Sequence, residues 1–203
     1  YTQAAMDYLF EQENCQIIIT ACNTASANAL RKLQQTYLPK AYPNRRILGV
    51  IVPTIEHAID QGFKNIGLIG TNYTVNCKIY EEELGKINPD IQIISKNTPL
   101  LVPLMENDGM EWIEEILHHY IEPLIKQNIQ TLILGCTHYS GLKDIIRQHF
   151  NIPVISQDEI IPLKLTDYLT RHPESNTLIG QGGTNHFYVT DLTPNYTEKA
   201  SSF

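Results

Sequence analysis

The sequence predicts an α/β fold made of two lobes, each built on a parallel sheet, that face each other across a cleft. Short runs of branched apolar residues alternate with stretches of helical period, which is typical of parallel sheets covered by helices on both faces. Two cysteine segments follow such runs, at residues 20–27 and 134–139. Because parallel sheets hold their ligands at the carboxyl ends of strands, facing lobes are the arrangement that brings these distant segments together.

In the first half of the chain, apolar periodicity and proline define the elements. Apolar residues at spacings of three and four predict helices, and continuous runs of isoleucine, leucine and valine predict buried strands. Pro39 and Pro43 are expected to end the second helix and Pro53 the second strand, because proline lacks a backbone N–H. We expect a helix at 2–13, a strand at 16–20, a helix at 24–37, a strand at 47–52, a short helix from 56 to a turn at 62, a strand at 65–70 and a helix at 73–84.

The second half of the chain continues the same alternation. Pro99 and Pro103 indicate a loop, and a long amphipathic stretch after it indicates a helix on the surface of the sheet. We expect a strand at 91–95, a helix at 110–126, a strand at 131–134, a helix at 142–150, a strand at 153–156, a helix at 160–171 and a last strand at 177–180.

Proline-bearing stretches near residue 43 and at 153–156 are the best candidates for boundaries between the lobes. Residues 1–45 and 157–203 are expected to form the first lobe, and residues 46–156 the second. The first predicted helix begins at once after Tyr1, which is not a start methionine, so we expect that a further segment precedes it.

Composition argues against several classes of partner. The 22 acidic and 15 basic residues give a formal net charge of −7, without the basic stripe that nucleic acid requires. No apolar run approaches the roughly 20 residues that cross a bilayer, and no secretory leader opens the chain. We therefore expect a cytoplasmic protein that binds neither nucleic acid nor membrane. Its four cysteines, Cys15, Cys22, Cys77 and Cys136, are expected to be reduced thiols.

Cys22 and Cys136 are the two candidate catalytic residues. Each follows a predicted buried strand and precedes a predicted helix, where unpaired N–H groups and the helix dipole favour thiolate over thiol. Each is also followed by polar residues suited to a ligand, Asn23 and Thr24 in one segment and Thr137 and His138 in the other.

Three other interpretations of these thiols stay open. A cysteine is often an inert core residue, although two thiols with polar successors are unusual in a core. Zinc held by Cys22, Cys136 and His138 is disfavoured, because no closely spaced ligand pair and no fourth ligand are evident. A hydrolase in which His138 activates one thiol leaves the second sulfur without a role.

Other polar residues have weaker signals. Thr71 and Thr74 follow a glycine turn that lacks a nucleotide-binding fingerprint, so they either bind an anion or cap a helix. Glu106 is expected in a loop after Pro103. His118 and His119 are expected on the surface of a helix.

A pair of thiols suits one reaction in particular. If one sulfur is a thiolate and the other a thiol, the first removes a proton from one face of a carbon acid and the second returns a proton to the opposite face. The stereocentre inverts without a cofactor. A water-excluding cleft that binds the substrate carboxylate through N–H and hydroxyl donors must assist, because the α-carbon of an amino acid is a weak acid.

The segments Ala-Cys-Asn-Thr-Ala-Ser-Ala and Gly-Cys-Thr-His-Tyr resemble the two signature segments of glutamate racemases, in the aspartate/glutamate racemase superfamily. Residues 67–74 and 99–106 are similar to that family as well, so the resemblance spans nearly the whole chain. The second segment discriminates further, because aspartate racemases usually carry glutamate at the position of His138. The resemblance implies two α/β lobes, no cofactor or metal, frequent homodimers and supply of D-glutamate for bacterial peptidoglycan.

The resemblance also implies roles for individual residues. Cys22 and Cys136 are the acid and base, and His138 assists Cys136. Glu106 has a supporting part near the site. The substrate's carboxylate and amino groups are expected to bind to Asn23, Thr24, Thr137 and Thr74.

The chain departs from the family pattern in two places. The family's leading strand with an Asp-Ser pair, and a later Pro-Tyr-Gly segment, have no counterpart here, and Ser140 replaces a usual proline. Two rival functions therefore remain: a truncated or inactive relative that binds a dicarboxylate without converting it, and a racemase of aspartate or another amino acid.

Overall fold

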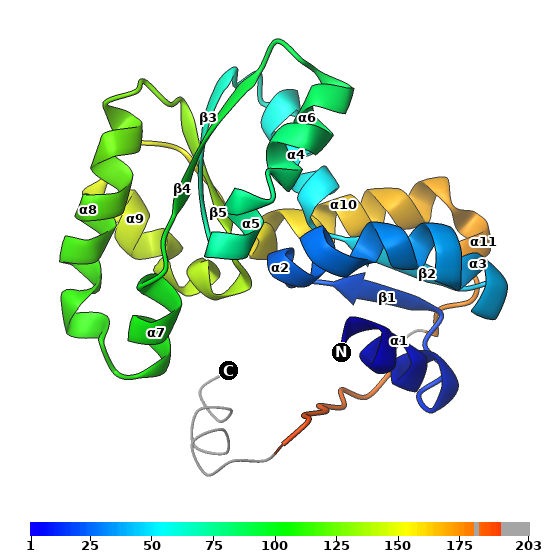
Figure 1. Ribbon diagram of the computed structural model, residues 1–203. Coiled ribbons are helices and arrows are strands. Elements are labelled where there is room, and N and C mark those ends of the chain that lie inside the picture. Colours follow the sequence, from blue (N-terminus) through cyan, green and yellow to red (C-terminus); the bar gives the residue numbers. More distant parts are fainter. Residues whose placement is uncertain (181–182, 192–203) are drawn as a thin grey trace.

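The computed structural model describes residues 1–180 and 183–191, and its strands form two parallel sheets (Figure 1). The smaller sheet pairs β1 (Ile17–Thr20) with β2 (Arg46–Gly49). The larger sheet has the strand order β4-β3-β5-β6, and its strands are β3 (Asn65–Gly70), β4 (Gln92–Asn97), β5 (Thr131–Gly135) and β6 (Val154–Ile155). Every ladder is parallel, which confirms the predicted α/β fold.

The strands of the larger sheet end in register. Gly70 at the end of β3 lies opposite Asn97 on one side and Gly135 on the other. The residues that follow these strands, Thr71 and Cys136 among them, therefore begin at the same edge of the sheet. In a parallel sheet this carboxyl edge is the place where ligands bind.

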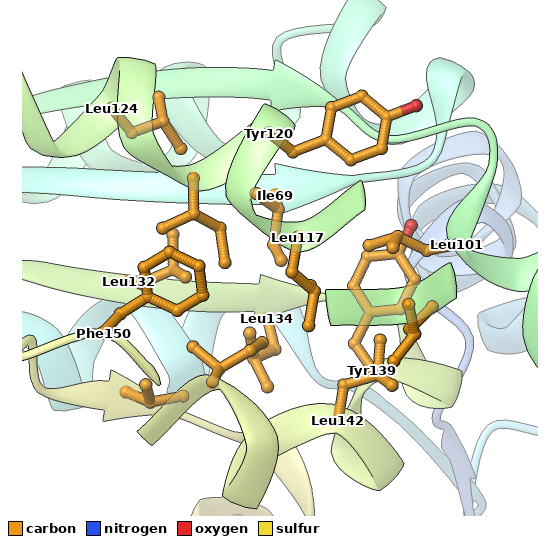
Figure 2. Packing of buried hydrophobic residues seen from close by; sticks show 14 of the residues in the cluster. Ile69, Leu101, Leu117, Tyr120, Leu124, Leu132, Leu134, Tyr139, Leu142 and Phe150 are labelled. Carbon is orange, nitrogen blue, oxygen red and sulfur yellow. The ribbon is translucent and has the colours of Figure 1, made fainter. Parts of the chain in front are cut away.

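Both faces of the larger sheet are buried at its central strands β3 and β5, as their continuous apolar runs predict, whereas the edge strand β4 is only half-buried. Figure 2 shows one face, where Ile69, Leu132 and Leu134 pack under α8 (Ile113–Ile125) and α9 (Lys143–His149). On the other face, Ile66, Leu68 and Ile133 contact α4 (Ile51–Asp60) and α6 (Ile79–Ile87). Alternate residues of the strands thus face the two helical layers.

The smaller sheet has its own apolar cluster. Met6 and Phe10 of α1 (Thr2–Glu11) pack against Leu30, Leu33 and Ile47. The helix expected at 24–37 is a run of short pieces that includes two π-helical turns: α2 (Asn23–Ala25), η1 (Ser26–Leu30), η2 (Leu33–Tyr37) and α3 (Leu38–Ala41). Pro39 does not end this run, because it lies in the first turn of α3, where no helical N–H is needed.

The predicted effect of proline is wrong at two further places. β2 ends at Gly49, before the predicted end at residue 52, and Pro53 lies in the first turn of α4. Pro103 lies in the first turn of a helix, α7 (Leu101–Glu106), where a loop was expected. In both cases the missing N–H falls among the unpaired groups of a helix start.

Three other boundaries differ from the prediction. The helix expected at 73–84 is broken into α5 (Asn72–Asn76) and α6 by Lys78, whose φ of 55° is left-handed. The long helix at 110–126 begins with a 3₁₀ turn, η3 (Met110–Trp112), before α8. Residues 177–180 form no strand: after α11 (Pro173–Asn176), Leu178 and Ile179 donate to carbonyls three residues back, so the segment continues as turns.

The predicted division into lobes stays a prediction, with one boundary better placed elsewhere. The β1–β2 ladder joins residues 46–49 to the first lobe, whereas the predicted boundary assigned them to the second. The ladder therefore favours a boundary after Gly49. The helix that follows β6 is α10 (Gln157–Arg171), and residues 181–182 and 192–203 of the predicted first lobe lie outside the described residues. No helix within the described ranges is long and apolar enough to span a membrane.

Candidate active site

Cys22 lies where β1 passes into the first helical turn. Its backbone is extended (φ −72°, ψ 121°), and it is the N-cap residue of α2, although its side chain makes no capping hydrogen bond. The residue is exposed. The strand end and the small, polar helix start present this sulfur at the carboxyl edge of the smaller sheet. The prediction that the strand is buried is wrong for β1, because it lies in a two-stranded sheet whose isoleucines are only half-buried or, at Ile19, exposed.

Cys136 has the matching position at the end of β5. It is extended (φ −148°, ψ 138°), half-buried, and caps the 3₁₀ helix η4 (Thr137–Leu142). Burial raises the pKa of the Cys136 thiol, and the backbone N–H groups of His138 and Tyr139 oppose this only in part. Negative charge on Cys22 and on Glu106 raises the pKa further. Cys136 is therefore biased toward its neutral thiol, the proton-donating form.

A hydrogen bond joins the two cysteine segments directly. The Thr137 hydroxyl, which follows Cys136, donates to the Ala21 carbonyl, which precedes Cys22, at 2.9 Å. A cavity of about 240 Å³ opens here, lined by residues of both sheets that include Ala21, Cys136, Thr137 and Gln157. Cys136 lines this cavity, whereas Cys22 does not: its segment reaches the cavity through Ala21, the residue before it. A larger cavity of about 300 Å³ lies over β1 and β2 and contains neither thiol.

His138 connects Cys136 to Glu106. Its Nδ1 lies 4.0 Å from the Cys136 sulfur, and its Nε2 lies 2.9 Å from Oε1 of Glu106. Glu106 is the last residue of α7 rather than a loop residue, which corrects the prediction. The carboxylate accepts the Nε2 proton and orients the ring, so that Nδ1 faces the sulfur.

Three threonine hydroxyls gather at the facing starts of α2 and α5. Oγ1 of Thr24 lies 3.0 Å from that of Thr71 and 3.4 Å from that of Thr74, and the latter two are 3.1 Å apart. Thr71 also caps α5 by accepting from the Thr74 N–H. The structure confirms the capping interpretation for Thr71, and anion binding by this pair stays a prediction. Thr74 itself is fully buried.

The side chain of Asn23 is buried and bonded to other residues, so it does not face a ligand. It is 2% exposed, and its amide nitrogen donates to Oε1 of Gln157 at 2.7 Å. Its amide oxygen accepts from the Tyr80 hydroxyl at 2.7 Å and from Nε2 of Gln157 at 3.0 Å. The side chain of Asn23 therefore anchors the turn after Cys22. Only its backbone N–H stays available for the predicted contact with substrate.

Sequence reasoning missed Gln157 and Tyr80. Gln157 also donates to Oγ1 of Thr54 at 3.3 Å and lies 3.2 Å from the Tyr80 hydroxyl, so one buried network joins four elements. Burial raises the pKa of Tyr80, which keeps its hydroxyl neutral and able to donate. A signal for Gln157 existed, because it follows a predicted strand end as Cys22 and Cys136 do.

Comparison with known proteins shows which family the chain belongs to. The sequence profile of the Asp/Glu/Hydantoin racemase family matches residues 2–160. The chain belongs to this family. The resemblance predicted from the two cysteine segments is thereby confirmed.

Relatives of known name support the same conclusion. A glutamate racemase of Dinoroseobacter shibae is 30% identical over all of this chain and 77% of the relative. A glutamate racemase of Sulfurihydrogenibium is 38% identical over 75% of this chain and 58% of the relative, and one of Trichormus variabilis is 35% identical over 72% and 48%. The chain thus spans between about half and three quarters of the length of these relatives.

Solved structures of the family have the same architecture. The glutamate racemase of Francisella tularensis, in complex with D-glutamate, superposes with a TM-score of 0.79 at 28% identity and covers 94% of this chain and 70% of that one. The Campylobacter jejuni glutamate racemase gives a TM-score of 0.78 at 25% identity over 100% and 78%. An aspartate racemase of Picrophilus torridus is less similar in structure, with a TM-score of 0.51 at 26% identity over 73% and 60%.

Proposed function

We propose that this protein is a glutamate racemase that interconverts L- and D-glutamate by proton transfer between two thiols. The observation that carries the proposal is the hydrogen bond from Thr137 to Ala21, which joins the segments of Cys22 and Cys136 at a cavity that Ala21 and Cys136 line. Membership of the racemase family and similarity to proteins named glutamate racemase support the choice of reaction. The greater structural similarity to glutamate than to aspartate racemases supports the choice of substrate.

The reaction needs one thiolate and one thiol. In one direction the Cys22 thiolate takes the α-proton and becomes a thiol, which leaves a carbanion at the α-carbon. The Cys136 thiol then donates its proton to the opposite face and becomes a thiolate. The raised pKa of Cys136 favours this starting state, because it keeps that sulfur protonated. In the reverse direction the two sulfurs exchange roles, and no cofactor takes part.

The surrounding groups are suited to bind the charged substrate and stabilise the carbanion. Both cysteines stand at the N-cap of a helical turn, where the dipole favours a negative charge, and the backbone N–H groups of His138 and Tyr139 bond to Cys136. The hydroxyls of Thr24 and Thr137 lie beside the same strand ends. His138, oriented by Glu106, acts on Cys136 as a positioning residue or as a proton relay.

The test is isotope exchange in deuterated water. Each enantiomer of glutamate and of aspartate is incubated with the protein, and loss of the α-proton signal is followed by NMR while circular dichroism follows inversion. We expect exchange and inversion with both glutamate enantiomers. Binding of glutamate without exchange would support a non-catalytic dicarboxylate-binding protein, and exchange restricted to aspartate would reassign the substrate.

Alanine variants separate the roles of the cysteines. Cys22→Ala and Cys136→Ala are each expected to lower the interconversion rate by about 10²-fold or more, because each removes an acid or base. Cys15→Ala is the matched control, since Cys15 is also a free thiol but lies in the apolar cluster of the smaller sheet. A Cys22 or Cys136 variant with the turnover of Cys15→Ala would remove that residue from the mechanism.

We also propose a cellular setting for this chemistry. All four cysteines are free thiols, which a reducing cytoplasm preserves. We place the enzyme there, with D-glutamate supplied to peptidoglycan synthesis. A homodimer is the expected assembly, and light scattering after size exclusion measures it.

A further inference from the structure

A second group of reactive side chains lies on the helical layer that covers the larger sheet. Glu114 and His118 are one turn apart on α8, and His149 is the last residue of α9 (Figure 1). One ligand atom from each of the three lies within 4.8 Å of the other two. Within the described part of the chain, no other three histidine, cysteine or acidic side chains meet this closely.

The contacts of this group resemble those of a metal site. Nδ1 of His149 lies 2.9 Å from Oε1 of Glu114, and the rings of His118 and His149 meet edge to face with centroids 6.2 Å apart. Tetrahedral zinc with ligand bonds of about 2.0–2.2 Å has ligand atoms roughly 3.3 Å apart. The nitrogen of His149 and the oxygen of Glu114 are already near that spacing, and all three ligand atoms lie within 4.8 Å of one another.

We propose that Glu114, His118 and His149 bind one divalent transition-metal ion, with zinc the best match. Two imidazole nitrogens and one carboxylate oxygen form a common zinc ligand set, and imidazole disfavours magnesium and calcium. The side chains of Glu114, His118 and His149 are 57%, 40% and 28% exposed. The ion therefore enters from solvent and takes water as its remaining ligand.

A fourth residue orients the ligands. Oε1 of Glu122, one turn beyond His118 on α8, lies 3.0 Å from Nδ1 of His118. Donation of the Nδ1 proton to this carboxylate leaves the lone pair of the ring on Nε2, free for the metal. Carboxylates hold metal-binding histidines in this manner. The ring of Phe150 packs against His118 at a centroid distance of 4.7 Å and limits its rotation.

The bound ion connects α8 to the end of α9. That helix continues directly from η4, which carries Thr137 and His138, so the ion stabilises the helical layer behind the thiol site. This proposal is independent of the racemase activity, because none of its ligands belongs to the candidate active site. Without a metal, the same residues form only exposed ion pairs, which contribute little to stability.

The test is titration of the full chain with zinc chloride by isothermal calorimetry. Cys22 and Cys136 also bind zinc, so the comparison is between variants that keep every cysteine. His118→Gln and His149→Gln are paired with His119→Gln, which changes the exposed neighbour on the same helix, and Glu114→Gln with Glu115→Gln. We expect loss of one zinc ion, or affinity at least about tenfold weaker, in the three site variants alone. Equal binding by site and control variants overturns the proposal.

A measurement on the unaltered protein does not depend on the folding of variants. NMR spectra of the histidine rings are recorded during addition of zinc chloride and, separately, of magnesium chloride. We expect the ring signals of His118 and His149 to shift with zinc and not with magnesium, while those of His119 stay in place. Unmoved His118 and His149 signals at saturating zinc overturn the proposal.

Discussion

Replacing Gln157 with leucine tests whether the buried network beside Cys22 holds the catalytic turn. The side chain is 8% exposed and bonds to both polar atoms of the Asn23 amide. Leucine fills a similar volume but accepts and donates nothing. The Asn23 nitrogen then loses the acceptor that it has at 2.7 Å, while the Asn23 oxygen keeps the Tyr80 hydroxyl.

The expected loss follows from these contacts. One buried donor without a partner costs about 1–3 kcal/mol, so we expect the free energy of unfolding to fall by about 2 kcal/mol. Tyr80→Phe removes a single donor, and the Asn23 oxygen keeps Nε2 of Gln157, so the expected loss is about 1 kcal/mol. Because both side chains bond to Asn23, the double variant is expected to deviate from additivity.

Urea denaturation followed by circular dichroism measures these values. Gln3→Leu is the matched control, because Gln3 is exposed on α1 and its replacement should change stability by less than about 0.5 kcal/mol. We also expect Gln157→Leu to lower kcat/KM, since the turn that begins with Cys22 loses its anchor. A Gln157→Leu protein as stable and active as Gln3→Leu would refute the reasoning.

Three further predictions follow from the site and the sheet. Gly135→Ala should lower the free energy of unfolding by about 1–3 kcal/mol, because a new Cβ meets the Ile69 carbonyl at 2.9 Å. Gly85→Ala is the control: its Cβ enters open space on α6, so the free energy of unfolding should rise by about 0.5–1 kcal/mol. Equal urea midpoints for the two variants would contradict this. Burial raises the pKa of Cys136. In the reaction direction that uses the Cys136 thiolate as base, kcat/KM should therefore still increase above a pH of about 8.5. A pH profile of kcat/KM that is already flat there would contradict this prediction. Glu106→Gln should lower kcat about tenfold, which is less than the loss of a direct acid or base would cause. Stability should hardly change, because the contact between Glu106 and His138 is exposed and contributes little to folding. A large loss of stability with unchanged kcat would contradict this prediction.

Most of the fold was predictable because its signals are local. The strands at 65–70 and 131–134 are runs of apolar residues that only a sheet buried on both faces accommodates. The errors occurred where one residue type has two local meanings. Pro53 and Pro103 were interpreted as breaks, but a proline in the first turn of a helix sacrifices no hydrogen bond.

The candidate site was predictable in part. Cys22 and Cys136 could be identified because each follows an apolar run and precedes polar helix starters, a pattern contained within a few residues. Gln157 offered only its position after a predicted strand end, and Tyr80 offered no signal, because the importance of both comes from Asn23, 134 and 57 positions away. A buried glutamine and an exposed one look alike in a sequence.

The sequence by itself determined the α/β class, the two thiols and the racemase resemblance, since hydrophobic period and short motifs are properties of neighbouring residues. Only the tertiary structure decided that Thr137 reaches Ala21, that the Asn23 amide is buried in a network, and that Glu106 meets His138. It also brought Glu114, His118 and His149 together. These arrangements depend on how strands and helices pack across the whole chain, and no local pattern encodes distances of that kind.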